Sequence, residues 1–208
     1  MKRNQYTLGK PISFKGNGLH SGIPVTITIR PAPAGSGIIF RRIDLIGTPE
    51  VPAKSEFVTN TLRATTLERG DAKVFTVEHI LSALFALRID NCILEMDAPE
   101  PPVADGGALT FSQMILEAGI VELEKQTDIL TLETSVAVYE DNKFITALPY
   151  DGLRITFTSI NPHPLLGTQM KDFIIDKETY IREIAPSRTI GFTWELEAMR
   201  QMGLGKGG

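Results

Sequence analysis

The segment FTVEHILSALFAL, residues 75–87, places Glu78 and His79 side by side at the start of an expected amphipathic helix, with Thr76 suited to cap it. The predicted packing stripe of this helix consists of Val77, Ile80, Leu81, Leu84 and Leu87. Glu78 and His79 lie outside this stripe. A neutral imidazole can bind zinc and a neighbouring carboxylate can accept a proton from water, so the pair suits metal-assisted hydrolysis. The alternative is a surface helix with a solvated glutamate and a half-buried histidine, and the dipeptide alone does not exclude it.

A catalytic zinc usually needs three protein ligands, and the sequence contains two further histidines. His20 lies in GNGLHSG, where flanking glycines allow close approach of a ligand; the alternative is a turn residue that only forms hydrogen bonds. His163 lies between prolines in NPHPLLG, where positioning of the loop is the alternative to chemistry. A site built from all three histidines is a further, less favoured arrangement.

The composition indicates a soluble globular protein, since 208 residues with 42% hydrophobic and 22% charged content can form one large or two small domains. A net charge of −4 gives no reason to expect nucleic acid as a partner. The sequence has neither a secretory signal nor an apolar run long enough to span a membrane, so we expect a cytoplasmic location. Cys92 has no partner for an internal disulfide and is expected to be a buried structural thiol.

Apolar periodicity in the first part of the chain predicts the strands and helices around these side chains. Alternation predicts strands at residues 25–30 and 38–43, joined by PAPAGSG as a hairpin with one buried face. The predicted elements also include a strand in YTLGKPISF, a strand at 91–98, a loop at 99–107 and a second helix at 109–119 ended by Gly119. The region between the second strand of the hairpin and residue 75 has no clear pattern.

The pattern restarts near residue 128, where ILTLETSVAVYE, KFITALP and LRITFTSI predict strands and TWELEAMRQMG predicts a helix. The order of elements suggests a second copy of the first unit. We therefore predict an α+β fold of two similar two-layer α/β sandwich domains, residues 1–126 and 127–208. The second domain is expected to be incomplete, because nothing follows its last helix to cover the apolar face.

Four segments resemble, in order and spacing, the UDP-3-O-acyl-N-acetylglucosamine deacetylases, zinc amidases of the committed step of lipid A (lipopolysaccharide) biosynthesis. They are GNGLHSG, RPAPAGSGIIFRR, TVEHILSALFALRIDNCILEMDAPEPPVADGGA and APSRTIGFTWELEAMRQMGLGKGG. The resemblance covers essentially the whole chain. It implies two similar α+β domains with the active site between them and an acylated UDP-sugar as substrate, and it leaves the oligomeric state open.

The resemblance also implies roles for individual residues. His79 is similar to the first zinc ligand of the family, Glu78 to the general base, and Thr189 to the threonine whose hydroxyl stabilises the oxyanion. The substrate, including its acyl chain, is expected to contact His20, Leu62, Ile190, Phe192, Leu196 and the segment 199–208 with Gly208 at its end. Ordinary core packing is the alternative for the apolar members of this set, and Fe²⁺ is an alternative to Zn²⁺.

The chain departs from the family in what it lacks. The other two zinc ligands of the family, a His and an Asp on one helix, and its general-acid His correspond to positions beyond residue 208. The resemblance therefore implies a truncated chain that holds half of a bipartite site and is inactive alone. Asn161 and Ile190 also replace aromatic residues that many relatives have. A UDP-sugar or acyl-binding module without turnover and an unrelated two-domain fold are the alternatives.

Overall fold

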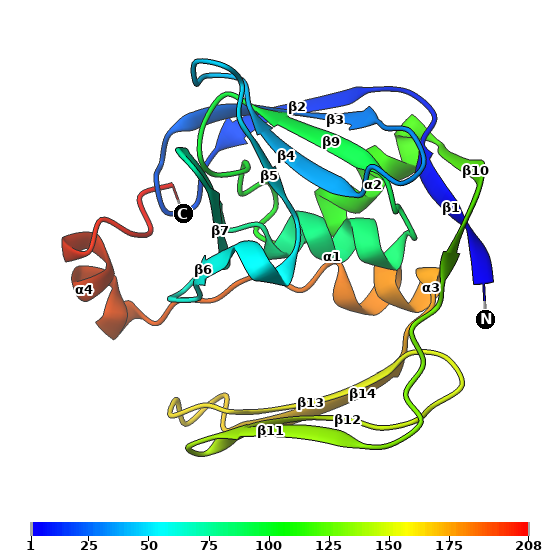
Figure 1. Ribbon diagram of the computed structural model, residues 1–208. Coiled ribbons are helices and arrows are strands. Elements are labelled where there is room, and N and C mark those ends of the chain that lie inside the picture. Colours follow the sequence, from blue (N-terminus) through cyan, green and yellow to red (C-terminus); the bar gives the residue numbers. More distant parts are fainter. Residues whose placement is uncertain (1, 208) are drawn as a thin grey trace.

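The computed structural model describes residues 2–207 as an α+β fold (Figure 1). Residues 2–128, the first unit, are built on a five-stranded sheet. In spatial order the strands are β2 (Ile12–Asn17), β3 (Pro24–Pro31), β9 (Cys92–Met96), β4 (Ile38–Arg42) and β5 (Glu50–Pro52). Neighbouring strands are antiparallel except for the parallel pair of β4 and β9. The two predicted strands at residues 25–30 and 38–43 are confirmed as β3 and β4.

The hairpin pairing itself was wrong, because β9 lies between β3 and β4. Leu94 of β9 is the register partner of Ile29 on one side and of Phe40 on the other. Cys92, Leu94 and Met96 are all buried, so β9 is stabilised by a central place in the sheet, where both of its edges are hydrogen-bonded. Alternation identifies the buried face of a strand, and it does not identify the neighbouring strand.

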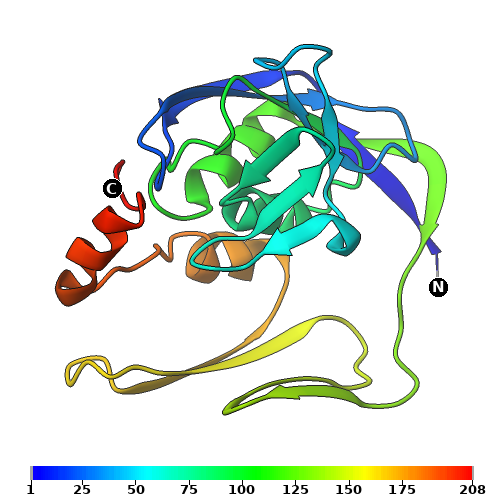
Figure 2. The ribbon, with the colours of Figure 1, turned by 60° about the vertical axis from the view of Figure 1, so that its left-hand side comes forward.

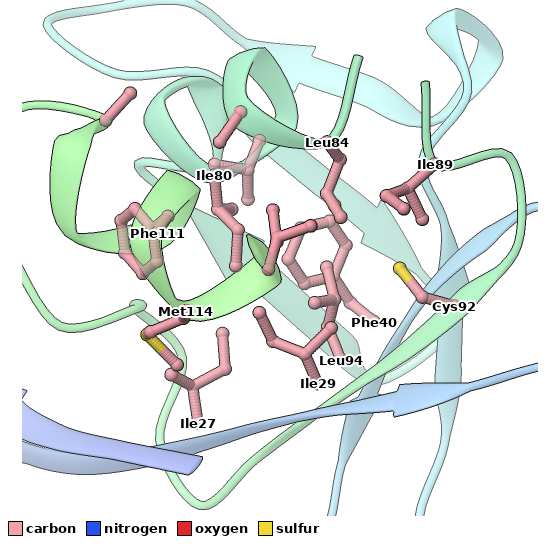
Figure 3. Close-up of a cluster of buried hydrophobic side chains, with 14 of the residues drawn as sticks. Ile27, Ile29, Phe40, Ile80, Leu84, Ile89, Cys92, Leu94, Phe111 and Met114 are labelled. Carbon is pink, nitrogen blue, oxygen red and sulfur yellow. The ribbon is translucent and has the colours of Figure 1, made fainter. Parts of the chain in front are cut away.

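Two helices, α1 (Glu78–Ala86) and α2 (Leu109–Ala118), cover one face of this sheet and contact each other (Figure 1). Figure 3 shows the core between the layers, to which the sheet, the two helices and the connection from α1 to β9 contribute Ile27, Ile29, Phe40, Ile80, Leu84, Ile89, Cys92, Leu94, Phe111 and Met114. Each large apolar side chain removed from water stabilises the fold by roughly 1.5–3 kcal/mol. The core therefore fixes α1 rigidly against the sheet.

Several shorter elements surround this core. The region without a clear sequence pattern forms η1 (Ser55–Phe57) and a three-stranded sheet of β6 (Val58–Asn60), β7 (Thr66–Arg69) and β8 (Ala72–Phe75). The segment YTLGKPISF does not form one strand; it divides into β1 (Lys2–Leu8), which pairs with β10 (Ile120–Asp128), and β2. The division falls at Gly9, where a Cβ atom would lie only 2.9 Å from the carbonyl oxygen of Ala118.

The second unit begins with two separate hairpins, β11 (Val136–Glu140) with β12 (Lys143–Ala147), and β13 (Arg154–Ile160) with β14 (Thr168–Ile174). Three of these strands match the prediction, and β14 was not predicted. Apolar side chains of the hairpins are largely exposed, among them Val138, Phe144, Ile145 and Phe157. Within residues 2–207, the hairpins thus have no second layer over them (Figure 2).

The chain then returns to the first unit through α3 (Lys177–Thr179) and the π-helical turn η2 (Tyr180–Ile184). Tyr180 is buried, and its hydroxyl shares a 2.7 Å hydrogen bond with Oγ of Ser82 on α1. The last elements are η3 (Thr193–Glu195) and α4 (Leu196–Gln201). Among residues 2–207, none of the helices has the length and apolar character needed to cross a membrane.

Candidate active site

The start of α1 places Glu78 in the first turn of the helix, although the predicted cap is not formed. Thr76 has a positive φ of 57° and its hydroxyl donates to Oε1 of Glu100 at 2.8 Å, so it cannot cap the helix. The helix begins after Val77 without a side-chain cap. The unpaired N–H groups and dipole of this end favour the negative charge of Glu78.

Glu78 and His79 lie beside each other at the edge of the core. The stripe prediction is confirmed by the complete burial of Val77, Ile80 and Leu84, whereas Glu78 and His79 are both half-buried. The Thr65 backbone N–H donates to Oε2 of Glu78 at 3.0 Å. Within residues 2–207 this is the one hydrogen bond to the carboxylate, so Glu78 is oriented and still has lone pairs to accept a proton.

Glu100 connects this helix start with the loop that carries His20. Its carboxylate is fully buried and accepts from the N–H groups of His20 at 2.9 Å and Ser21 at 2.8 Å, in addition to the Thr76 hydroxyl. Charge-assisted bonds of this kind hold a buried carboxylate in place. Sequence reasoning missed Glu100; the available signal was an acidic residue directly between two prolines.

His20 is buried and contacts two segments that are distant in the sequence. Its Nδ1 accepts the N–H of Gly205 at 3.3 Å, and its Nε2 faces the carbonyl oxygen of Arg63 at 3.4 Å. These partners assign the ring proton to Nε2, because Nδ1 acts as an acceptor. His20 therefore joins the loop before β7 to the C-terminal segment.

A cavity of about 440 Å³ lies between these segments. Its walls are His20, Asn60, Leu62, Ala64, Thr66, Lys73, Phe75, Met202 and Leu204. Thus His20, Leu62 and part of the segment 199–208 lie around one space. A larger hollow of about 980 Å³, lined by Arg41 and residues 45–50 and 69–71, contains none of the predicted site residues.

Other expected substrate contacts lie outside the walls of this cavity. Ile190 and Leu196 are 65% and 40% exposed. Phe192 forms a parallel stack with Trp194, with ring centroids 4.5 Å apart, and His163 stacks on both rings. Trp194 was not singled out from the sequence, although its position two residues after Phe192 was a usable signal. Gly208 lies outside the described residues.

Thr189 is held against the first unit by its backbone, while its side chain is exposed. Its N–H donates to the carbonyl oxygen of Gly106 at 2.8 Å, and the N–H of Ala108 donates to Ala185 at 3.1 Å. Gly107 permits this approach, because a Cβ atom there would lie 2.6 Å from the Ser187 carbonyl oxygen. The segment carrying Thr189 therefore follows the loop that leads into α2.

The described residues do not by themselves form a complete metal site. Within residues 2–207, no group of three or more His, Cys, Asp or Glu side chains is placed to hold a metal ion. The arrangement of all three histidines is not formed, because His20 contacts Gly205 and His163 stacks on Phe192. His79, half-buried beside an oriented carboxylate, fits the role of a single donor.

Comparison with known proteins gives a consistent family match. The sequence model of the LpxC family, UDP-3-O-acyl N-acetylglycosamine deacetylase, matches residues 5–208. A bifunctional enzyme LpxC/FabZ of Chlorobaculum tepidum is 44% identical over 98% of this chain and 44% of its own length. UDP-3-O-acyl-N-acetylglucosamine deacetylases of Myxococcus xanthus and Legionella pneumophila are 42% and 41% identical, over 99% and 98% of this chain. The chain spans only 65% and 68% of the length of these two relatives.

Proposed function

The chain belongs to the LpxC family of UDP-3-O-acyl N-acetylglycosamine deacetylases, and we propose that it carries the first-unit half of such an active site. The reaction would be hydrolysis of the N-acetyl group of UDP-3-O-acyl-N-acetylglucosamine, at the committed step of lipid A biosynthesis. Residues 127–208 would then form part of a second domain, and the protein would act in the cytoplasm. Its partner would be this small acylated UDP-sugar.

The proposal is carried by the pairing of an oriented carboxylate with an imidazole at one helix end. Glu78 is fixed by the Thr65 N–H and keeps lone pairs for a proton, so it can take a proton from water. His79 follows directly and is half-buried, which suits a group that must meet both protein and substrate. A solvated surface glutamate would not need the Thr65 contact.

His79 would hold a metal ion from the first unit, and bound zinc would supply a Lewis acid to polarise the acetamide carbonyl. Further donors are needed, since residues 2–207 supply no set of three. We propose that they come from the part of the relatives' length that this chain does not span. Iron(II) is an alternative metal for such a site.

The hydroxyl of Thr189 would donate a hydrogen bond to the oxyanion that develops on the acetamide. The backbone bond from Thr189 to Gly106 supports this role, because a transition-state donor must be held in place before the reaction. The cavity beside His20 and Leu62 would take the acyl chain, since its volume of about 440 Å³ suits a flexible alkyl group. Phe192, Leu196 and Ile190 would contact the substrate outside that cavity.

The test is acetate release from UDP-3-O-acyl-N-acetylglucosamine by the full-length protein. We expect Glu78→Gln to lower kcat by about 10²- to 10⁴-fold, because the amide cannot accept the proton. Glu117→Gln, at an exposed position of α2, is the matched control and should turn over normally. Normal turnover by Glu78→Gln would contradict the assignment of Glu78.

A second candidate is a module that binds the UDP-sugar without turnover. It is favoured by the absence, within residues 2–207, of three side chains placed to hold a metal. Calorimetry with the substrate in the presence of a chelator separates the two candidates. Tight binding combined with no acetate release from the metal-loaded protein would support the module.

A further inference from the structure

The last described residues, 192–207, cross from the second unit to the loop that follows β2 (Figures 1 and 2). We call this segment the strap; it contains η3 and α4. One end is fastened by Gly205, whose N–H donates to Nδ1 of His20, and by Gly207, whose N–H donates to the Leu19 carbonyl oxygen at 3.0 Å. These bonds place the end of the strap against the wall of the cavity.

The other end of the strap is fastened by an ion pair between Arg63 and Glu195. Nη2 of Arg63 lies 2.6 Å from Oε1 of Glu195, and Nη1 lies 3.3 Å from Oε2. This two-point geometry is the one in which arginine binds a carboxylate best. The Arg63 guanidinium also holds the pKa of Glu195 below its ordinary value, which is consistent with a formed pair.

Between the two fastenings the strap packs little against the rest of the protein. None of the α4 residues Leu196–Gln201 is buried. Arg63 itself has a positive φ of 60°, a conformation that a non-glycine residue adopts only where contacts hold it. The ion pair and the carbonyl contact with His20 are contacts of that kind.

The cavity lies between the loop that carries Arg63 and the C-terminal part of the strap. Leu62 and Ala64, on either side of Arg63, line one wall, while Met202 and Leu204 line the wall formed by the strap. Separation of Arg63 from Glu195 would let the strap move away from Leu62. The ion pair itself is not part of the lining.

We propose that Arg63 and Glu195 form a clasp that holds the strap across the mouth of this cavity, and that the clasp positions the acyl chain of the substrate. The identity of the occupant, the acyl chain, rests on the proposed function, whereas the existence of the clasp is inferred from the geometry of this chain. Both are positioning residues, because neither lines the cavity. The acyl chain would enter when the clasp opens and be retained when it closes.

The first measurement is hydrogen exchange of the backbone amides of residues 196–205 in the full-length protein. Arg63→Gln, Glu195→Gln and the double variant should speed this exchange by about two- to five-fold, the effect of losing one exposed ion pair. The charge reversal Arg63→Glu with Glu195→Arg should restore slow exchange. Arg154→Gln, which breaks a comparable exposed pair with Asp172 in the β13–β14 hairpin, is the matched control and should leave the strap unchanged.

The second measurement is deacetylation kinetics with substrates of different acyl length. Loss of the clasp should raise KM for long acyl chains about two- to five-fold with kcat nearly unchanged, and the charge reversal should recover KM. Unchanged exchange in both single variants overturns the clasp. Faster exchange with an unchanged KM overturns its role in acyl positioning. A wild-type protein without deacetylase activity refutes the proposed function instead, and the exchange result still decides whether the clasp exists.

Discussion

The backbone N–H of Thr65 donates to the carboxylate of Glu78 at 3.0 Å, which ties the first residue of α1 to the loop that carries Leu62 and Arg63. The contact fixes the position of the group that we propose as proton acceptor. It therefore links chemistry at the helix start to the geometry of the neighbouring cavity.

Glu78→Asp tests this positional requirement. The shorter side chain keeps its charge and cannot reach both Thr65 and the same proton position, and a displacement of about 1 Å can lower a rate about 100-fold. We therefore expect kcat to fall by roughly that factor while the protein remains folded, as measured by acetate release and circular dichroism. Glu117→Asp on the exposed side of α2 is the control. A kcat within twofold of the wild-type value would show that the Thr65 contact has no role in catalysis.

Glu100→Gln tests the buried connection between the His20 loop and α1. The wild-type carboxylate accepts hydrogen bonds from the N–H groups of His20 and Ser21 and from the Thr76 hydroxyl. An amide presents an NH₂ group to at least one of these donors and leaves it unpaired, which costs about 1–3 kcal/mol of unfolding free energy. Urea unfolding should show this loss. A change below about 0.5 kcal/mol, the range of ordinary surface substitutions, would refute the bridging role.

The clasp predicts a pH-dependent signal from Trp194, the single tryptophan of the sequence and the neighbour of Glu195. Arg63 lowers the pKa of Glu195 from its ordinary value of 4.5 by hydrogen bonding to the charged form. The stabilisation is therefore present above pH 4.5 and is lost as the pH falls through the lowered pKa. Trp194 emission should change with a midpoint below pH 4.5, and Arg63→Gln should move the midpoint upward. Identical midpoints in the two proteins would contradict the coupling.

Cys92 is expected to cause a second pH effect, a loss of stability as the pH rises. Burial raises the pKa of its thiol from 9.0 to about 12, so the folded state keeps the proton at a pH where the unfolded chain loses it. The stabilisation is complete below pH 9 and is lost as the pH rises towards 12. The free energy of unfolding of the wild-type protein should therefore fall more steeply over this interval than that of Cys92→Ala. Parallel pH curves would mean that the thiol is not buried in solution.

The sequence predicted those parts of the fold in which apolar residues recur at a regular spacing. Alternation located β3, β4 and β9, and the helical stripe correctly left Glu78 and His79 outside the core. The hairpin of β3 with β4 failed because strand order depends on contacts with β9, which is distant in the sequence. β14 was missed because its sequence, TQMKDFI, has no regular alternation of apolar and polar residues.

The candidate site was predictable where a local pattern carried it and not where distant segments meet. Glycines around His20 and the Glu78–His79 dipeptide were visible in the sequence. The capping prediction for Thr76 failed because the buried carboxylate of Glu100 takes its hydroxyl. No local pattern joins Arg63 to Glu195, which are 132 residues apart, since each alone is an ordinary surface charge.

Metal binding by His79 is tested by the zinc content of variants at the start of α1. The full-length protein should retain about one zinc per chain as wild type and as Glu78→Gln, and should lose it as His79→Gln, because only His79 is proposed to donate to the metal from the first unit. His163→Gln, a histidine of the aromatic stack, is the control and should retain zinc. Equal zinc content in His79→Gln and wild type, measured by elemental analysis, would contradict the account.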